Sequence, residues 1–432
     1  MVGFAACLAL ELRFNHMGAI LVGRYTMLAT LGAWWVAFAV AAWCVLQLPR
    51  RWATALIVVG AVAFFGAALT RGTQISDDLY RYAWDGTVAA HGIDPYRYAP
   101  DDPHLSVLHD AWLWPSPRTC AALGKPVNCT RVNRAGDRTI YPPVAQIWFR
   151  ALHAFLPPDS RERGYQVAHG LVGLGLTVLL MGALSHLGRN PAWAVLWAWS
   201  PLAVVEAAMD AHVDVVAAVA VVAALWALER RRAATGGALL GVAIAVKLIP
   251  GVLVPAGLRR HPLRVAGAAI TVVGLSYLPH VLAVGPRVLG YLPGYLQEEN
   301  YSAGSRFLLL GLVRLHGGAA QAVAVALLAG VTAVVALRRE PVSVITRARW
   351  MLTAVFVIVT PVQPWYGELL VVVAVLDGAW EPLVLAAAAY PLYFGTILES
   401  AAPGFGQVSY GIAVVVLVVT ALWHSRGAPP PD

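Results

Sequence analysis

The residues best suited to chemistry are two adjacent carboxylates, Asp77 and Asp78, which follow a long apolar segment. The next residues are polar and aromatic: Arg81, Tyr82, Trp84 and Asp85. If this run is helical, Asp78, Arg81 and Asp85 lie on one face, because steps of three and seven residues return to the same side. The two adjacent carboxylates, Asp77 and Asp78, can supply a general base and a group that orients the acceptor. The alternative is that Ser76 caps a helix and that the acids answer its dipole.

A second acidic group lies between two apolar segments: Glu206, Asp210, His212 and Asp214. Three acids and one histidine are ligands that a divalent metal accepts. However, these positions are spread around a helix and lack a tight ligand spacing. We therefore expect hydrogen bonds to sugar hydroxyls or to helix ends, and no metal or other cofactor.

One lysine, Lys247, is flanked by apolar residues on both sides. Ionisable groups in such segments are functional candidates by default. Lys247 either extends to a membrane interface or meets an anion, and the anion most available in a membrane is a lipid phosphate. Arg306, in the polar segment 286–306, offers a second cation.

Aromatic and amide side chains accumulate in three further places. Tyr96 and Tyr141 lie in proline-containing loop segments, and Gln146 follows the second of these. Because proline fixes such segments as extended or turn structure, they form either a sugar platform or a rigid cap. A turn between two apolar segments carries the third set: Gln363, Trp365 and Tyr366. This set belongs either to an aromatic belt at the membrane interface or to the same cavity.

The composition of the chain shows which elements must position these groups. Of its 432 residues, 59% are hydrophobic and 12% are charged, and the mean hydropathy is +0.67. These values exclude a soluble protein. Residues 71–165 hold 21 of the 54 charged residues. The sequence therefore predicts an all-α polytopic membrane protein with one large polar loop.

The sequence predicts about 11 to 13 membrane spans, although several of the apolar segments are shorter than a bilayer requires or are interrupted by proline. The clearest are residues 27–48 and 52–70, which contain no charge. Further spans are expected at residues 166–187, 191–208, 213–228, 236–257, 265–285, 318–337, 350–364, 366–377, 381–398 and 411–424.

Short loops with arginine set the orientation. The arginine clusters at 50–51, 230–232, 259–264 and 338–349 fall on one side, which is then cytoplasmic. Residues 236–257 then begin and end inside, so we expect two half-helices broken near Pro250. The net charge of +8 reflects these clusters and requires no nucleic acid.

Five regions follow from this reading. Residues 1–26 are an N-terminal segment whose order is left open, because their apolar start is too short for a span and lacks a signal-peptide cleavage pattern. Residues 27–70 form a transmembrane hairpin, residues 71–165 an extracytoplasmic catalytic loop with interfacial helices, residues 166–424 a transmembrane bundle and residues 425–432 a cytoplasmic tail. In an oxidising compartment Cys120 and Cys129 either form a disulfide or remain two free thiols.

The ordered set of motifs resembles the GT-C superfamily of integral-membrane glycosyltransferases. It is most similar to glycosyltransferase family 87 and to the polyprenol-phosphate-mannose-dependent mannosyltransferases of actinobacteria. The resemblance rests on the acidic pair and on five further segments: 80–86, 92–96, 141–146, 200–214 with its acids and histidine, and 241–250 with its lysine. Residues 363–366 complete the set.

This resemblance implies a GT-C-like bundle in the bacterial plasma membrane with its active site facing outside. Its members move sugar from a polyprenyl-phosphate monosaccharide to a lipid-linked or polysaccharide acceptor, usually with inversion. The resemblance implies that Asp77 or Asp78 is the general base and that mannose is the sugar. The donor phosphate is already a good leaving group, so the remaining tasks are to deprotonate the acceptor and to neutralise the departing dianion. We assign the second task to Lys247 and Arg306.

Two other kinds of function compete with a glycosyltransferase: transport and a non-catalytic scaffold role. In a lipid or sugar transporter or flippase, Lys247 and Glu206 would line a pathway, and broken half-helices occur in transporters. No inverted repeat is visible in the sequence, and a 95-residue loop exceeds what a carrier requires. A non-catalytic scaffold leaves the acids at the end of the second span unexplained.

Overall fold

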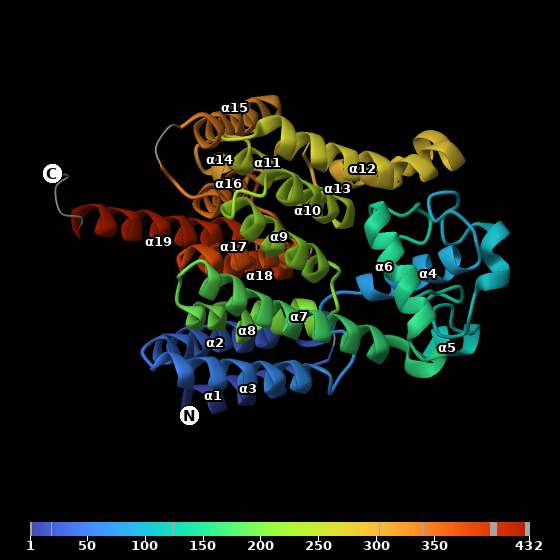
Figure 1. Ribbon diagram of the computed structural model, residues 1–432. Helices are drawn as coiled ribbons and strands as arrows, with labels where there is room; N and C mark the ends of the chain where they lie inside the picture. The colour runs from blue at the N-terminus through green and yellow to red at the C-terminus, as the bar shows by residue number, and fades with distance from the viewer. Residues whose placement is uncertain are drawn as a thin grey trace.

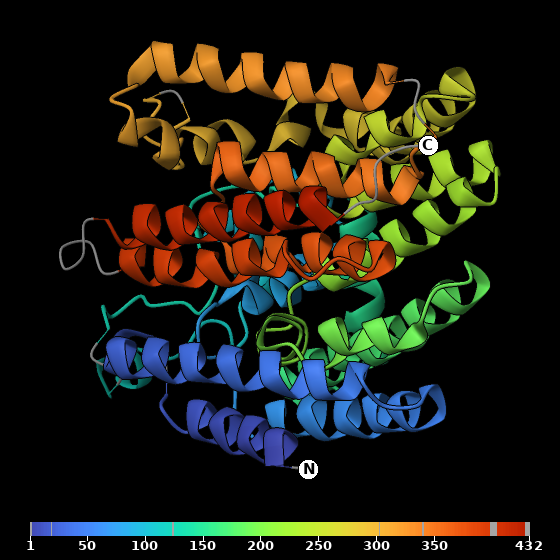
Figure 2. The same ribbon diagram turned by 90° about the vertical axis from the view of Figure 1, so that its left-hand side faces the viewer.

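The computed structural model describes residues 2–18, 20–122, 125–301, 303–338, 341–397 and 404–427. Within these ranges the chain is all-helical and contains no β-strand. Figure 1 shows long helices gathered in a bundle, with the short helices of the polar loop at one end. Seen from the side in Figure 2, the long helices run next to one another, with α15 (Gly317–Leu337) at one edge and the N-terminal helices at the other.

The N-terminal region consists of three helices: α1 (Val2–Asn15), α2 (Ile20–Leu46) and α3 (Arg50–Ala68). The sequence left the order of residues 1–26 open, and in the structure α1 packs against both α2 and α3. The reason is burial, because Cys7 and Phe14 are enclosed and Asn15 Nδ2 donates a hydrogen bond of 2.9 Å to the carbonyl of Ala67. This contact ties α1 to the end of α3, just before the acidic pair.

The polar loop folds as a compact unit around two helices, α4 (Asp78–Ala90) and α6 (Pro143–Phe155), which pack against each other. Its smaller helices are η1 (Pro103–Leu108), α5 (Pro117–Ala122) and η2 (Pro158–Ser160). A disulfide joins Cys120 to Cys129, with the two Cα atoms 5.8 Å apart. The structure thus selects the disulfide from the two alternatives that the sequence left open.

The bundle begins with α7 (Arg161–His186) and contains several short and broken helices. The first half comprises η3 (Pro191–Ala194), α8 (Val195–Ala198), the π-helix η4 (Ala203–Met209), α9 (Asp214–Glu229), α10 (Ala233–Val246), η5 (Ile249–Leu253), α11 (Val254–Gly257) and α12 (Pro262–Val284). The second half comprises η6 (Gly285–Leu289), α13 (Leu292–Glu298), α14 (Leu308–Leu312), α15, α16 (Val344–Val359), η7 (Pro364–Tyr366), α17 (Gly367–Asp377), α18 (Leu383–Ile397) and α19 (Phe405–Gly427).

Six helices of the described residues are long and apolar enough to cross a membrane, or seven if one bent pair counts as a span. That pair, Pro191–Ala198 with Ala203–Met209, is bent by 65°. The sequence predicted one continuous span at 191–208, which is wrong in that respect. The total of 11 to 13 spans stays a prediction, because α10, α16, α17 and α18 are apolar but short. Residues 428–432 of the predicted cytoplasmic tail lie outside the described residues.

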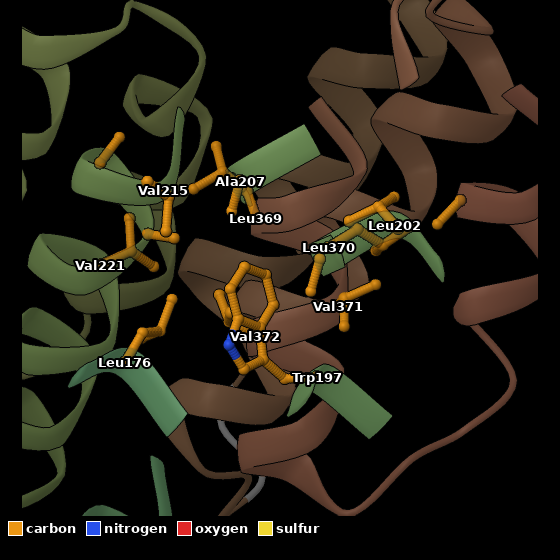
Figure 3. Packing of buried hydrophobic residues seen from close by; sticks show 14 of the residues in the cluster. Leu176, Trp197, Leu202, Ala207, Val215, Val221, Leu369, Leu370, Val371 and Val372 are labelled. Atoms are coloured by element: carbon orange, nitrogen blue, oxygen red, sulfur yellow. The ribbon is translucent and has the colours of Figure 1, made fainter. Parts of the chain in front are cut away.

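The centre of the bundle is α17, whose side chains are buried on every face. A helix that is apolar all round belongs inside a protein. Figure 3 shows Leu369, Leu370, Val371 and Val372 of α17 packed among side chains of neighbouring helices: Leu176, Trp197, Leu202, Val215 and Val221. Since lipid is as apolar as these side chains, close packing rather than escape from water holds such helices together.

Helices α10 and α12 approach closely because glycine lies where they meet. A Cβ atom on Gly237 would lie 2.3 Å from the carbonyl oxygen of Val265, and one on Gly241 would lie 2.8 Å from that of Ala269. Small residues four positions apart let two backbones meet in this way. The contact fixes the end of α10, from which Lys247 follows directly.

The predicted break in residues 236–257 is confirmed, although it lies before Pro250. Helix α10 ends at Val246, and Lys247 adopts an extended conformation with φ −149° and ψ 139°. The chain then re-enters helix in η5 and α11. Lys247 therefore sits in the gap between two half-helices.

Candidate active site

A cavity of about 600 Å³ lies where the polar loop meets the bundle. Eight of the side chains that the sequence singled out as site residues line it: Asp77, Asp78, Arg81, Tyr141, Lys247, Gln363, Trp365 and Tyr366. Further polar groups from the loop and from α13 complete the wall: Asn133, Arg134, Arg138, Tyr295, Glu298 and Glu299. Its apolar part comes from η5, α15 and α16: Leu248, Ile249, Val252, Leu328, Val355 and Val359.

The acidic pair is held by one amide and one phenol. Asn133 Nδ2 donates to Asp77 Oδ1 at 3.0 Å and to Asp78 Oδ1 at 2.6 Å. Tyr141 donates its hydroxyl proton to Asp78 Oδ2 at 2.9 Å. Asp78 thus accepts from two side chains, whereas Asp77 accepts from Asn133 alone among the described side chains. Asp77 is the carboxylate with more capacity left for a substrate.

Asp77 lies at the start of α4, and its side chain is exposed at the cavity, which itself lies between the polar loop and the bundle. Burial raises the pKa of its carboxyl group, and the negative charge of Asp78 raises it further, while the hydrogen bond from Asn133 acts in the opposite direction. A carboxylate with a raised pKa is a better proton acceptor than an ordinary aspartate.

The backbone ahead of the acidic pair is anchored by the second acidic group. The amides of Gln74 and Ile75 donate to the Asp210 carboxylate at 2.7 and 3.4 Å. His212 Nε2 lies 3.0 Å from Ser76 Oγ, which also accepts from the amide of Asp78 at 3.3 Å. Asp210 and His212 are fully buried and do not line the cavity. They hold the acidic pair in place rather than facing a substrate.

Glu206 lies one step deeper in the same cluster. Its Oε1 accepts a hydrogen bond from Tyr390 at 2.6 Å, and its Oε2 lies 3.0 Å from His212 Nδ1. The ring of His212 stacks on Trp365, with centroids 4.1 Å apart. Glu206, predicted to contact substrate, is likewise fully buried and behind the cavity wall. The sequence could identify its polarity but not the depth at which the bent helix pair places it.

Asp85 and Gln146 fix the segment that carries Asn133 and Tyr141. Asp85 forms a buried ion pair with Arg81 at 3.0 Å, as the shared helix face predicted, and accepts from Gln146 Nε2 at 3.1 Å. Arg81 in turn donates to the carbonyl of Asp137 at 2.9 Å. Asp85 and Gln146 therefore support the wall from behind.

Three predicted aromatic contacts pack inside the polar loop instead of lining the cavity. Tyr82 stacks on Phe149 with centroids 4.5 Å apart, and Trp84 packs edge-on against Trp114. Tyr96 donates its hydroxyl proton to the carbonyl of Tyr141 at 2.7 Å. These rings shape the loop core and set the position of Tyr141.

Lys247 reaches the cavity from the gap after α10. Its Nζ donates to Asp214 Oδ2 at 2.9 Å and lies over the rings of Tyr141 and Tyr366, 5.2 and 5.4 Å from their centroids. The side chain of Lys247 is 13% exposed, and that of Asp214 is fully buried. Tyr141 therefore touches both functional groups, because its ring faces the ammonium of Lys247 and its hydroxyl binds Asp78.

The remaining wall was largely missed by sequence reasoning. Glu299 accepts from Gln363 Nε2 and forms an ion pair of 2.9 Å with Arg306. Arg306 is buried and does not line the cavity, so the structure places it behind Glu299. Arg134 pairs with Glu298 through two contacts of 3.1 and 2.5 Å. The one sequence signal for α13 was its place in the polar segment 286–306. No sequence signal marked Asn133.

Metal binding receives no support from this arrangement. Within the ranges that the structure describes, no group of three or more His, Cys, Asp and Glu side chains is placed to hold a metal ion. The acids around Asp210 contact backbone amides, a histidine and a lysine instead.

Comparison with known protein families gives a match over the second part of the site. The model of glycosyltransferase family 87 matches residues 139–361, just over half of the chain. The matched stretch contains Tyr141, Lys247 and Glu299 and begins after the acidic pair. No curated protein and no solved structure matches the chain significantly.

Proposed function

Because the chain belongs to glycosyltransferase family 87 and is thus a glycosyltransferase, we propose that it transfers a hexose, mannose in the first instance, from a polyprenyl-phosphate donor. The acceptor is a lipid-linked glycan or a polysaccharide on the extracytoplasmic face of the bacterial plasma membrane. The observation that carries this proposal is the shared cavity of the acidic pair and Lys247, which Tyr141 joins.

In this proposal Asp77 is the general base. The acceptor hydroxyl attacks C1 of the donor sugar, a new C1–O bond forms, and the proton of the hydroxyl passes to the Asp77 carboxylate. The C1–O bond to phosphate breaks on the opposite side, which inverts the configuration. Asp77 is favoured over Asp78 because it accepts fewer hydrogen bonds and its pKa is raised. Asp78, fixed by Tyr141, orients the acceptor.

Lys247 takes the departing polyprenyl phosphate. A fixed cation at the point where charge develops lowers the barrier, and it is most effective where water is scarce. The pair with Asp214 sets the direction of the ammonium, and the two tyrosine rings limit its hydration. Arg306 is paired with Glu299 and buried, so its contribution is indirect.

The apolar part of the cavity suits the first isoprene units of the donor. It lies between η5, α15 and α16, and Leu248 and Ile249 directly follow Lys247. A phosphate bound at Lys247 therefore has apolar side chains beside it. We also propose that the short apolar helices complete a bundle of 11 to 13 spans, which keeps these residues at the level of lipid.

A donor screen tests the proposed function. Purified protein is supplied with polyprenyl phosphates of mannose, glucose and arabinose together with a total lipid extract, and the products are identified by mass spectrometry. We expect a mannosylated product that Asp77→Asn fails to form. The absence of product with every donor would contradict the proposal, and lipid movement in proteoliposomes without a glycosyl product would favour a flippase.

A further inference from the structure

The side chains of Glu299 and Gln363, on the wall formed by α13 and the turn at 363–366, have no role in the proposed transfer reaction. Glu299 and Gln363 line the cavity there, and Gln363 Nε2 donates to Glu299 Oε1. Arg306 lies behind them and holds the other carboxylate oxygen of Glu299 at 2.9 Å. The Glu299 and Arg306 side chains are 9% and 6% exposed, so this is a built cluster and not a surface pair.

Glu299 receives the donors of this cluster, except for Arg306 Nε, which is buried without a hydrogen-bond partner among the described residues. The amide nitrogen of Gln363 and the guanidinium of Arg306 are both directed at Glu299. Gln363 Oε1 is buried and has no hydrogen-bond partner among the described residues. Buried acceptors almost always have a donor, and a carboxylate has room for more than two. Gln363 Oε1 therefore lacks a donor, which a hydroxyl group of a bound ligand can supply.

Aromatic side chains surround these acceptors. The hydroxyls of Tyr295 and Tyr366 are 2.9 Å apart, and Tyr301 also lines the cavity. Rings with a polar edge next to a few fixed acceptors are suited to a ligand that has apolar C–H faces and several hydroxyls. A sugar ring has this character, whereas a carboxylate-bearing sugar would be repelled by Glu299.

The cluster is connected to Lys247 through Tyr366. The Tyr366 ring lies 5.4 Å from Lys247 Nζ, and its hydroxyl contacts Tyr295, which precedes Glu299 by one helical turn. Tyr141 makes the corresponding link from Lys247 to the acidic pair. A phosphate bound at Lys247 therefore lies between two walls of the cavity. One wall carries the proposed base, and the other carries the acceptors of Glu299 and Gln363.

We propose that Glu299 and Gln363 form a subsite that binds hydroxyl groups of the uncharged donor sugar and so selects the sugar. This inference rests on the proposed function, because it places the sugar relative to the phosphate at Lys247. Arg306 is a positioning residue that orients the Glu299 carboxylate.

Donor analogues that lack single hydroxyls test the subsite. Wild-type kcat/KM is measured with the preferred polyprenyl-phosphate hexose and with its 2-, 3-, 4- and 6-deoxy forms, and the same series is repeated with Gln363→Met. Gln363→Met keeps the Glu299–Arg306 pair and removes two things, the free acceptor Oε1 and the hydrogen bond that Gln363 Nε2 donates to Glu299. We expect the wild type to discriminate against one deoxy donor by about tenfold or more. In the variant this ratio falls toward one, with the loss for the parent donor mainly in KM.

A second variant and a control guard against unfolding. Glu299→Gln, whose fold is checked by thermal unfolding, should also reduce the deoxy discrimination and admit a uronosyl donor that the wild type rejects. Glu162→Gln is the control, because Glu162 lies outside the cavity and accepts from Trp112. It should leave every ratio unchanged.

Three results decide the matter. An equal loss for all donors in Gln363→Met, with the deoxy ratios unchanged, would overturn the subsite while leaving the glycosyltransferase proposal intact. A wild type that treats all deoxy donors alike would do the same. A wild type that transfers from no donor at all would overturn both.

Discussion

Replacing Lys247 by methionine separates the structural from the chemical role of this lysine. Its Nζ contacts Asp214 Oδ2 at 2.9 Å, Asp214 is fully buried, and Asp214 Oδ1 has no hydrogen-bond partner among the described residues. Lys247→Met therefore leaves a buried carboxylate without its cation. Breaking a buried pair in this way costs about 3–5 kcal/mol of stability. The double variant Lys247→Met/Asp214→Asn removes both charges and should recover most of that loss.

The catalytic rate should behave differently. If Lys247 neutralises the departing phosphate, both variants lack that cation, and kcat should fall by about 100- to 1000-fold, or about 2.7–4 kcal/mol in the barrier. The assay is initial-rate transfer from polyprenyl-phosphate mannose in detergent, with the melting temperature of each variant measured in parallel. Lys125→Met is the matched control, since Lys125 is the other lysine of the chain and lies exposed in the polar loop.

Two results would refute this reasoning. A double variant that regains the wild-type rate along with its stability would show that Lys247 acts only by compensating Asp214. A single variant as stable as the wild type would show that Asp214 does not need the cation, so the pair would not set the direction of the ammonium.

Four further predictions concern the acidic pair and its supports. Asp77→Asn should lower kcat by about 10²- to 10⁴-fold, the range typical of a general base, whereas Asp78→Asn should lower kcat by a smaller factor. If both variants transfer sugar at the wild-type rate, neither aspartate is the general base. Because the base acts when ionised and the pKa of Asp77 is raised by burial and by Asp78, kcat/KM should fall as pH drops through a value above the ordinary aspartate pKa of about 3.9, and a pH–rate profile checks this. Asp210→Asn should lower kcat at unchanged donor KM, because it weakens the anchor of the backbone before the pair; a normal kcat would limit Asp210 to stability. Reduction of the Cys120–Cys129 disulfide should lower the free energy of unfolding by about 2–3 kcal/mol by the chain-entropy account, which is measured as a lower melting temperature. The same reductant should leave the melting temperature of a Cys120→Ser/Cys129→Ser variant unchanged.

Sequence patterns located much of this site because two kinds of signal were local. Asp77 and Asp78 follow an apolar span, and a lysine inside apolar sequence is costly wherever it lies. The family resemblance then ordered these segments, and the match to glycosyltransferase family 87 confirms that family. The break beside Lys247 was predictable from orientation, although proline drew the predicted position three residues too far along the chain.

Other parts of the site depend on contacts between distant segments and could not be predicted. Asn133 bridges the two acids across more than 50 residues of sequence, and nothing in its neighbourhood marks it. Glu299 directly follows α13, a short helix without the length or pattern of a span. Arg306 was recognised as a cation, but its partner Glu299 was not, so its side chain was expected at the phosphate.

The buried acids show why intramembrane charge alone is an ambiguous guide to substrate contacts. Non-helical backbone at membrane depth needs partners for its amides, because no water is available there. The chain leaves helix at the segment before α4 and again between η4 and α9, and Asp210 at the second break accepts the amides of Gln74 and Ile75 at the first. Its charge is thus explained by the irregular backbone that presents the acidic pair. Lys247 and Asp77 differ because both line the cavity in addition to their contacts within the protein. This access to the cavity is the reason why we propose them, and not Asp210, as the groups that act on the substrate.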